Sequence, residues 1–118
     1  MPVAGPVGLG SAAVCQETGN CLMVGVDADQ FFSAPDFADV WLVSIQKNMD
    51  VAVYNTINNI HTLGSLGNQF NGTLANGGVG VSPQHDVAWP DGLEAEIAAL
   101  RQDIIDGVVS VTGPPAEG

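Results

Sequence analysis

The sequence predicts an α/β fold built on an open parallel sheet, and two observations carry this prediction. Two continuous apolar runs of strand length, residues 21–26 and 39–45, are typical of strands covered on both faces. Segments with helical spacing alternate with these runs, which favours parallel strands joined by right-handed crossovers. In such sheets, ligands bind outside the carboxyl ends of the strands, so residues at those ends are the first candidates for a site.

The beginning of the chain is expected to hold a strand end followed by a short helix. Residues 1–5 are short and apolar, like the last residues of a strand. The helix is expected within residues 8–20, where Ser11 serves as its N-cap and Gly19 stops it.

A loop and a longer helix follow the first predicted strand. Residues 27–38 are expected to form a loop, because Pro35 forbids regular strand pairing. After the second strand, residues 46–64 show helical spacing, and Gly64 or Gly67 is expected to end that helix. Its apolar positions are Met49, Val53, Ile57 and Ile60.

The last third of the chain is expected to be irregular and then helical. Residues 65–86 are polar and rich in glycine, with at most two short strands, near Thr73 and Val79. A final helix is expected after Asp91, which serves as its cap, and Gly107 stops it. Its apolar face consists of Leu93, Ile97, Leu100 and Ile104.

The charge of the chain excludes two classes of partner. Lys and Arg together number 2 against 13 Asp and Glu, which gives a formal net charge of -11. Nucleic acids and anionic membrane surfaces are both bound by clusters of basic side chains, which this composition does not supply. No apolar run reaches the roughly 18 to 20 residues of a membrane span, and we find no signal peptide or lipobox.

The cysteines and histidines are expected to be structural rather than catalytic. Cys15 and Cys21 are not spaced as C-x-x-C and have no second pair to complete a zinc site, so no metal or cofactor is expected. Two free, half-buried thiols are the first expectation, and a disulfide is the alternative. His61 and His85 are expected on the surface, with no nucleophile beside them.

Two charged residues at predicted strand ends are the candidate ligand-binding residues. Asp27 follows the first strand directly, and a carboxylate with two acceptor oxygens suits a pair of vicinal hydroxyls such as those of a ribose. A loop aspartate that caps a turn is the simpler reading. Lys47 follows the second strand near a helix start, where the helix dipole disfavours positive charge. Three interpretations of this lysine are open: it binds a ligand, it neutralises the charge of Asp27, or it is simply an exposed surface residue.

A glycine-rich segment suggests a different function. Residues 8–13, "GLGSAA", match G-x-G-x-x-A, and Asp27 follows Gly8 by 19 positions. This spacing is typical of a dinucleotide-binding turn with an acid for the ribose. The alternative function is therefore the nucleotide-binding domain of an NAD(P)-dependent enzyme.

Several blocks in order along the chain resemble one known family. They are "AGPVGLGSAAV", "VGVDADQ", "VSIQKNMDVAVYNTI", "NGGVGVSP" and "IIDGVVSV". Together they are similar to the basic membrane protein family of ABC-transporter substrate-binding lipoproteins, of the purine nucleoside receptor type. This resemblance implies a Rossmann-like lobe of a type I periplasmic binding protein, over residues 1–112, with a flexible tail at 113–118.

The resemblance also implies a ligand, partners and a location. It implies a binding protein without catalysis, whose nucleoside contacts would include Asp27, Lys47 and the backbone of Gly5, although Pro6 departs from the usual small residue after that glycine. It covers only the carboxyl-terminal part of such proteins, so we expect a fragment without the first lobe. The implied partners are that lobe and a transporter permease, and the implied location is extracytoplasmic and membrane-anchored.

Overall fold

The protein is a small α/β fold with a three-stranded mixed sheet, in a computed structural model that describes residues 1–3, 7–64 and 69–111. The strand order is β1 (Met23–Asp27), β2 (Trp41–Lys47) and β3 (Val79–Val81). β1 and β2 are parallel, whereas β3 runs antiparallel to β2. The expected all-parallel sheet is therefore wrong at β3, because the chain returns directly along β2 after α3 instead of crossing over the sheet. β1 and β2 each begin two residues later than expected.

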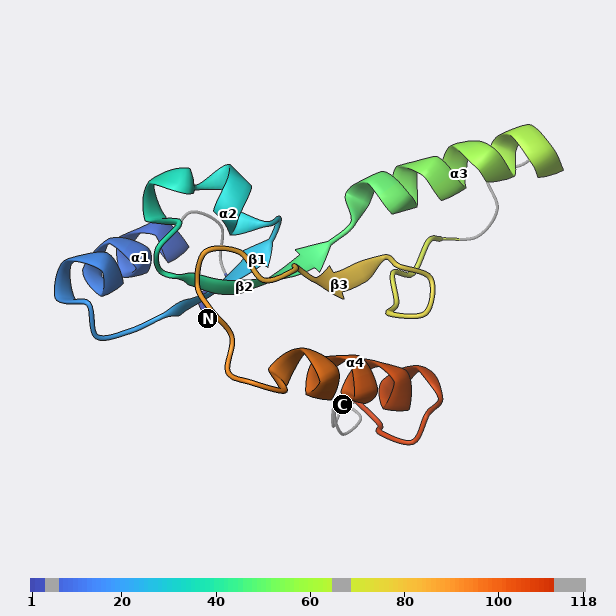
Figure 1. Cartoon of the computed structure of the whole chain (residues 1–118). Helices are drawn as coiled ribbons and strands as arrows, with labels where there is room; N and C mark the ends of the chain where they lie inside the picture. Colours follow the sequence, from blue (N-terminus) through green and yellow to red (C-terminus); the bar gives the residue numbers. More distant parts are fainter. Residues whose placement is uncertain (4–6, 65–68, 112–118) are drawn as a thin grey trace, which may run out of the picture.

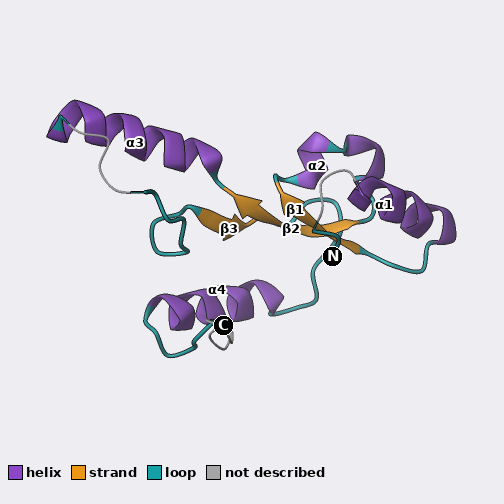
Figure 2. Cartoon of the chain, turned by 180° about the vertical axis from the view of Figure 1, so that it is seen from behind, coloured by secondary structure: helices purple, strands orange, loops and turns teal. Residues whose placement is uncertain are grey.

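The helices lie at different ends of this sheet. They are α1 (Val7–Thr18), α2 (Gln30–Ser33), the 3₁₀ helix η1 (Pro35–Phe37), α3 (Met49–Leu63) and α4 (Leu93–Ile105). α1 and α2 lie together at one end of the molecule, and α3 extends away from the other end (Figures 1 and 2). Neither α3 nor α4 packs extensively against another of the described helices or strands.

The ends of the helices differ from the expectations in identifiable ways. α1 begins at Val7, so Ser11 lies inside the helix and does not cap it. Gly19 and Gly64 end α1 and α3 with positive φ values of 63° and 66°, which confirms both as stops. Asp91 does not cap α4, because Gly92, at φ 87°, occupies the N-cap position.

The predicted loop between β1 and β2 contains two short helices, so that prediction is wrong. Asp29 is the N-cap of α2, and its side chain accepts a hydrogen bond from the Phe31 backbone N–H at 3.2 Å. Pro35 then begins η1, where its fixed φ and missing N–H are tolerated. No strand forms near Thr73, where residues 74–77 form a turn instead.

The buried core is small and lies between α1, β1 and the start of β2. Its members are Ala12, Cys15, Met23, Val40 and Trp41, with Ala34 and Phe37 packed against them. The radius of gyration is 17.1 Å, against about 13 to 14 Å for a compact domain of this length. The chain is therefore more open than a typical single domain, and many large apolar side chains remain exposed.

An irregularity at Leu42 sets the register of the parallel strands. Met23 pairs with Trp41, but Val24 pairs with Val43, so Leu42 is skipped. The carbonyl of Leu42 instead accepts a hydrogen bond from Nε1 of Trp89 at 2.8 Å. Beyond the bulge, Gly25 pairs with Ser44 and Asp27 pairs with Gln46.

Ser44 connects three segments at the centre of the sheet. Its hydroxyl accepts a hydrogen bond from the Gln30 backbone N–H at 3.0 Å, at the start of α2. Its own backbone N–H donates to the hydroxyl of Ser82 at 2.9 Å, and both serines are almost fully buried. Because buried polar groups are costly when unpaired, these bonds fix the start of α2, β2 and the segment after β3 relative to one another.

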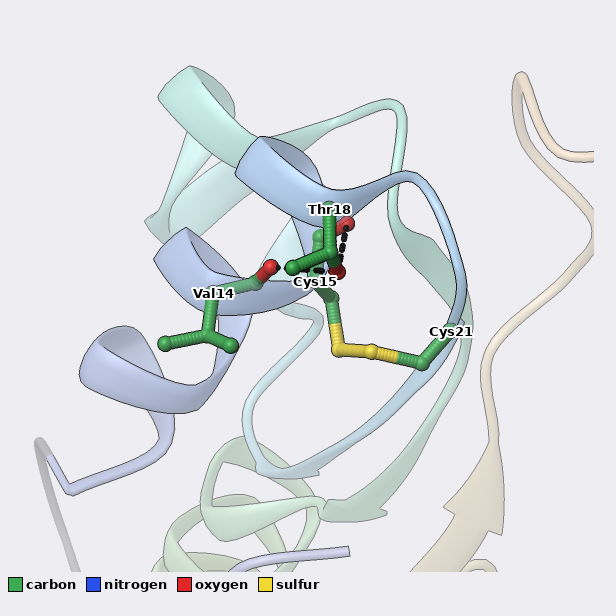
Figure 3. The surroundings of a disulfide bond; sticks show 4 residues. All are labelled: Val14, Cys15, Thr18 and Cys21. Carbon is green, nitrogen blue, oxygen red and sulfur yellow. Dashed lines mark hydrogen bonds between the residues drawn. A yellow bond between two sulfur atoms is a disulfide. The ribbon is translucent and has the colours of Figure 1, made fainter.

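Cys15 and Cys21 form a disulfide, so the expectation of two free thiols is wrong. Cys15 lies near the end of α1 and Cys21 lies two residues before β1, with their Cα atoms 5.0 Å apart (Figure 3). The glycine that ends α1 folds the chain back between the two cysteines. In the last turn of α1, the Thr18 hydroxyl donates to the carbonyl of Val14 at 2.8 Å.

We predict that Gly25→Ala destabilises the fold, because a Cβ there would lie 2.5 Å from Ser44 Oγ and closer still to the Gln30 side chain. The expected loss is roughly 1 to 3 kcal/mol in the free energy of unfolding, measured by urea denaturation. Gly10→Ala is the matched control, because nothing lies within 4 Å of its Cβ. This helical substitution should be neutral or stabilising by up to about 1 kcal/mol, and an equal loss in both variants would contradict the proposed crowding at Gly25.

We predict that reducing the disulfide lowers the free energy of unfolding by about 2 kcal/mol, the chain-entropy cost for a short closed loop. The measurement is urea denaturation with and without dithiothreitol. A double variant, Cys15→Ser with Cys21→Ser, should start at the lower value and show no response to the reductant. If dithiothreitol still lowered the stability of that variant, the loss of stability would not come from reduction of the Cys15–Cys21 disulfide.

Candidate functional site

Asp27 ends β1 in a backbone conformation that is unusual for an aspartate. Its φ is 74°, and it is the one residue other than glycine with positive φ in the described part of the chain. Aspartate enters this region more readily than most residues, yet still at a cost of about 1 kcal/mol or more. Backbone strain of this kind concentrates at binding and catalytic sites, where a side chain must be aimed in one direction.

Lys47 ends the neighbouring strand and contacts Asp27 directly. The Lys47 Nζ lies 2.7 Å from Asp27 Oδ1, so the lysine does neutralise the aspartate, as one of the readings of the sequence proposed. The side chains remain 66% and 50% exposed, respectively. An ion pair this open to water contributes at most about 1 kcal/mol to stability, so its geometry leaves both groups available to a ligand.

Two open hollows flank the Asp27 carboxylate. One, of about 470 Å³, lies beside Lys47 and the beginning of α3, and is lined by Asp27, Ala28, Gln46, Lys47, Asn48, Met49 and Asp50. The other, of about 290 Å³, lies beside α1 and α2. Asp27 and Ala28 line both, so the aspartate stands between them. The larger hollow falls in the range of small-molecule sites.

The remaining predicted site features do not join this pair. Gly5 lies outside the described residues, so its expected backbone contact stays a prediction. The segment "GLGSAA" lies inside α1, and both of its glycines are helical. A dinucleotide-binding turn requires its first glycine in the turn before the helix, so this geometry does not favour the NAD(P) alternative.

A second cluster, which the sequence did not reveal, fixes the loop after Asp27. His85 Nε2 lies 2.8 Å from Asp29 Oδ2, and both side chains are nearly buried, at 13% and 12% exposure. The Phe31 ring stacks on His85 with centroids 4.2 Å apart. The expectation that His85 lies on the surface is therefore wrong. Phe32, in contrast, remains 72% exposed.

The Asp29–His85 contact positions α2 and thereby the strand end beside it. Asp29 caps α2 with one oxygen and holds His85 with the other. Because the two residues are 56 positions apart in sequence, no local pattern could identify the pair. Only the N-cap role of Asp29 is indicated by the sequence, because aspartate is a common residue directly before the start of a helix.

The Asp27–Lys47 pair is suited to recognition of a polar, hydroxyl-bearing molecule. The carboxylate accepts hydrogen bonds, and Lys47 engages only its Oδ1 among the contacts described. The ammonium group has three donors for carbonyl, ring-nitrogen or hydroxyl acceptors. A ligand with adjacent donors and acceptors can therefore bind both side chains at once.

Metal-binding clusters and membrane-spanning helices are both absent from the described residues. Residues 1–3, 7–64 and 69–111 hold no group of three or more His, Cys, Asp and Glu side chains that could bind a metal ion. In the same ranges, no helix has the length and apolar character needed to cross a membrane.

Comparison with known proteins adds no assignment. No protein-family model and no curated protein matches this chain.

We predict that Asp27→Gly stabilises the fold or leaves it unchanged, whereas Asp27→Ala destabilises it. Glycine removes the cost of the positive φ, and alanine keeps that cost while losing the contact with Lys47. The difference between the two variants should be about 1 kcal/mol in the free energy of unfolding, by urea denaturation. Equal stability of the two variants would show that Asp27 carries no backbone strain.

Proposed function

We propose that this chain is a nucleoside-binding lobe of an ABC-transporter substrate-binding protein of the basic membrane protein family. The observation that carries the proposal is the exposed Asp27–Lys47 pair at the carboxyl end of the parallel strands, with Asp27 held at positive φ. Open α/β sheets bind their ligands at this edge. The family resemblance of the sequence blocks around both residues supports the same assignment.

In this proposal, the two side chains divide the recognition of the sugar and the base. Vicinal ribose hydroxyls donate to the Asp27 carboxylate, which is a charge-assisted and therefore strong type of hydrogen bond. The Lys47 ammonium stays paired with Oδ1 and donates a further hydrogen bond to an acceptor on the ligand. No covalent step is involved, because the function is capture and release.

The openness of the site defines the partners that this function requires. Both charged groups are at least half exposed, whereas small-molecule sites usually bury 70–90% of the ligand surface. A second α/β lobe that closes over the hollows would supply the missing contacts, and a transporter permease would receive the ligand. This role requires that the protein lie outside the cytoplasmic membrane, tethered to it by a lipid.

We predict weak binding of guanosine, inosine and adenosine to this chain, detected as shifts of the Asp27 and Lys47 amide signals in nuclear magnetic resonance titrations. Asp27→Asn should weaken that binding about 5- to 150-fold, as expected for the loss of roughly 1 to 3 kcal/mol from a hydrogen bond to a charged group. Asp91→Asn, an exposed loop acid on the way to α4, is the matched control and should leave the affinity unchanged.

Two outcomes would contradict the proposal. Shifts that are identical in the wild type and the Asp27→Asn variant would remove Asp27 from the site. Binding of NAD without binding of any nucleoside would favour the enzyme alternative instead.

A further inference from the structure

The apolar stripe of α3 points away from the rest of the protein. The apolar residues of its exposed side are between 43% and 70% exposed, and they are Met49, Val53, Tyr54, Ile57, Ile60 and Leu63. The half-buried side of the helix, turned toward the rest of the chain, is mostly small or polar and carries Val51, Ala52, Asn55, Thr56 and Asn59. Figure 1 shows α3 extending beyond the sheet, with no other labelled helix beside it. The usual arrangement of an amphipathic helix, apolar side inward, is thus reversed.

The start of α3 is held in this position by hydrogen bonds. The backbone N–H of Asn48 donates to the carbonyl of Gly78 at 2.9 Å, and its side-chain amide donates to the carbonyl of Gly77 at 2.8 Å. These bonds tie the helix start to the segment before β3. The outward direction of the stripe therefore follows from contacts within the chain.

The stripe supplies more than half of the area that one partner buries in a standard protein interface. A large side chain presents on the order of 150 Å² when fully exposed. At the exposed fractions above, the stripe offers on the order of 500 Å², against about 800 Å² buried per partner in a standard interface. An apolar patch of this extent is a typical sign of an interaction surface.

The charges beside the stripe indicate what covers it. Apart from Asp50, α3 carries no acidic residue, although the chain as a whole has a net charge of -11. This helix is therefore a region where two copies can approach with little repulsion. Asp50 and His61 lie near opposite ends of the helix. Because they are about three full turns apart, both lie along the same edge of the stripe.

We propose that the stripe is a self-association surface on which a second copy of this chain packs its own α3 in antiparallel orientation. A two-fold axis near Thr56 then places Asp50 of each copy at the height of His61 of the other, on the same edge of the stripe. A histidine ring N–H can donate to that carboxylate, and a protonated ring adds opposite charge. Antiparallel pairing thus provides two equivalent polar contacts at the rim of an apolar centre, the usual anatomy of an interface.

The first test is the oligomeric state of the full chain in analytical ultracentrifugation over a range of concentrations. The expected result is a monomer–dimer equilibrium. Ile57→Asp places a carboxylate in the centre of the stripe and should weaken the dimer at least about tenfold. Asn58→Asp, which adds the same charge at an exposed position about 100° around the helix from Ile57, at the edge of the stripe, should change it less than about twofold. Circular dichroism checks that both variants keep the helix content of the wild type.

The second test determines the orientation by disulfide trapping. In the antiparallel dimer, Ile57→Cys, on the stripe and one residue from the axis, lies next to its own copy, whereas the copies of Met49→Cys lie about 20 Å apart along the helices. A disulfide needs Cα atoms within about 7 Å, so of these two variants only Ile57→Cys should cross-link under mild oxidation. Cys15 and Cys21 are already paired with each other and do not compete.

Three results would overturn the proposal. They are a chain that stays monomeric at every concentration, a dimer that Ile57→Asp leaves intact, and efficient cross-linking through Met49→Cys. The second of these would assign self-association to another surface, such as the apolar hollow of about 860 Å³ between α4 and the sheet. Nucleoside binding does not enter either test, so this inference stands or falls separately from the proposed function.

Discussion

The parallel pairing of β1 with β2, with Leu42 skipped, is the constraint on which the rest of the structure depends. In a regular strand, residues three apart point to opposite faces of the sheet. Here the Trp41 side chain and the Ser44 hydroxyl both contact the segment that holds α2 and η1, which the bulge between them makes possible. Without the skipped residue, Asp27 would pair with Ile45 and not with Gln46. Gly25 would then no longer face Ser44, and Lys47 would lie one residue further from Asp27.

The bulge is itself held by a residue from the segment between β3 and α4. The indole N–H of Trp89 donates a hydrogen bond to the carbonyl of Leu42. Two residues further along β2, the backbone N–H of Ser44 donates to the hydroxyl of Ser82. His85 lies between Ser82 and Trp89 in sequence and pairs with Asp29. One segment after β3 therefore contacts both the middle of β2 and the start of α2. The exposed Asp27–Lys47 pair is weak in itself, and its geometry is set by this buried framework.

The sequence indicates this architecture where a local pattern is sufficient. The apolar runs, the glycine stops and the aspartate at a strand end each depend on a few neighbouring residues, and the structure has both strands, both stops and Asp27 at the end of β1. The bulge at Leu42, the Asp29–His85 pair and the direction of β3 depend on contacts between distant segments. The helical spacing of α3 is evident in the sequence, but spacing identifies an apolar stripe without showing what that stripe contacts.

The hollow of about 470 Å³ beside Lys47 and the stripe meet at the beginning of α3, which links the two proposals physically. Met49 and Asp50 line the hollow beside Lys47, and the same two residues begin the stripe and its polar edge. A second copy packed along α3 would bring the end of its own helix, with His61 and Leu63, to the rim of that hollow. A ligand that touched Asp50 would then meet a different surface in the dimer than in the monomer. Because such coupling is reciprocal, any change that dimerisation makes in ligand affinity must appear as an equal change that the ligand makes in dimer stability.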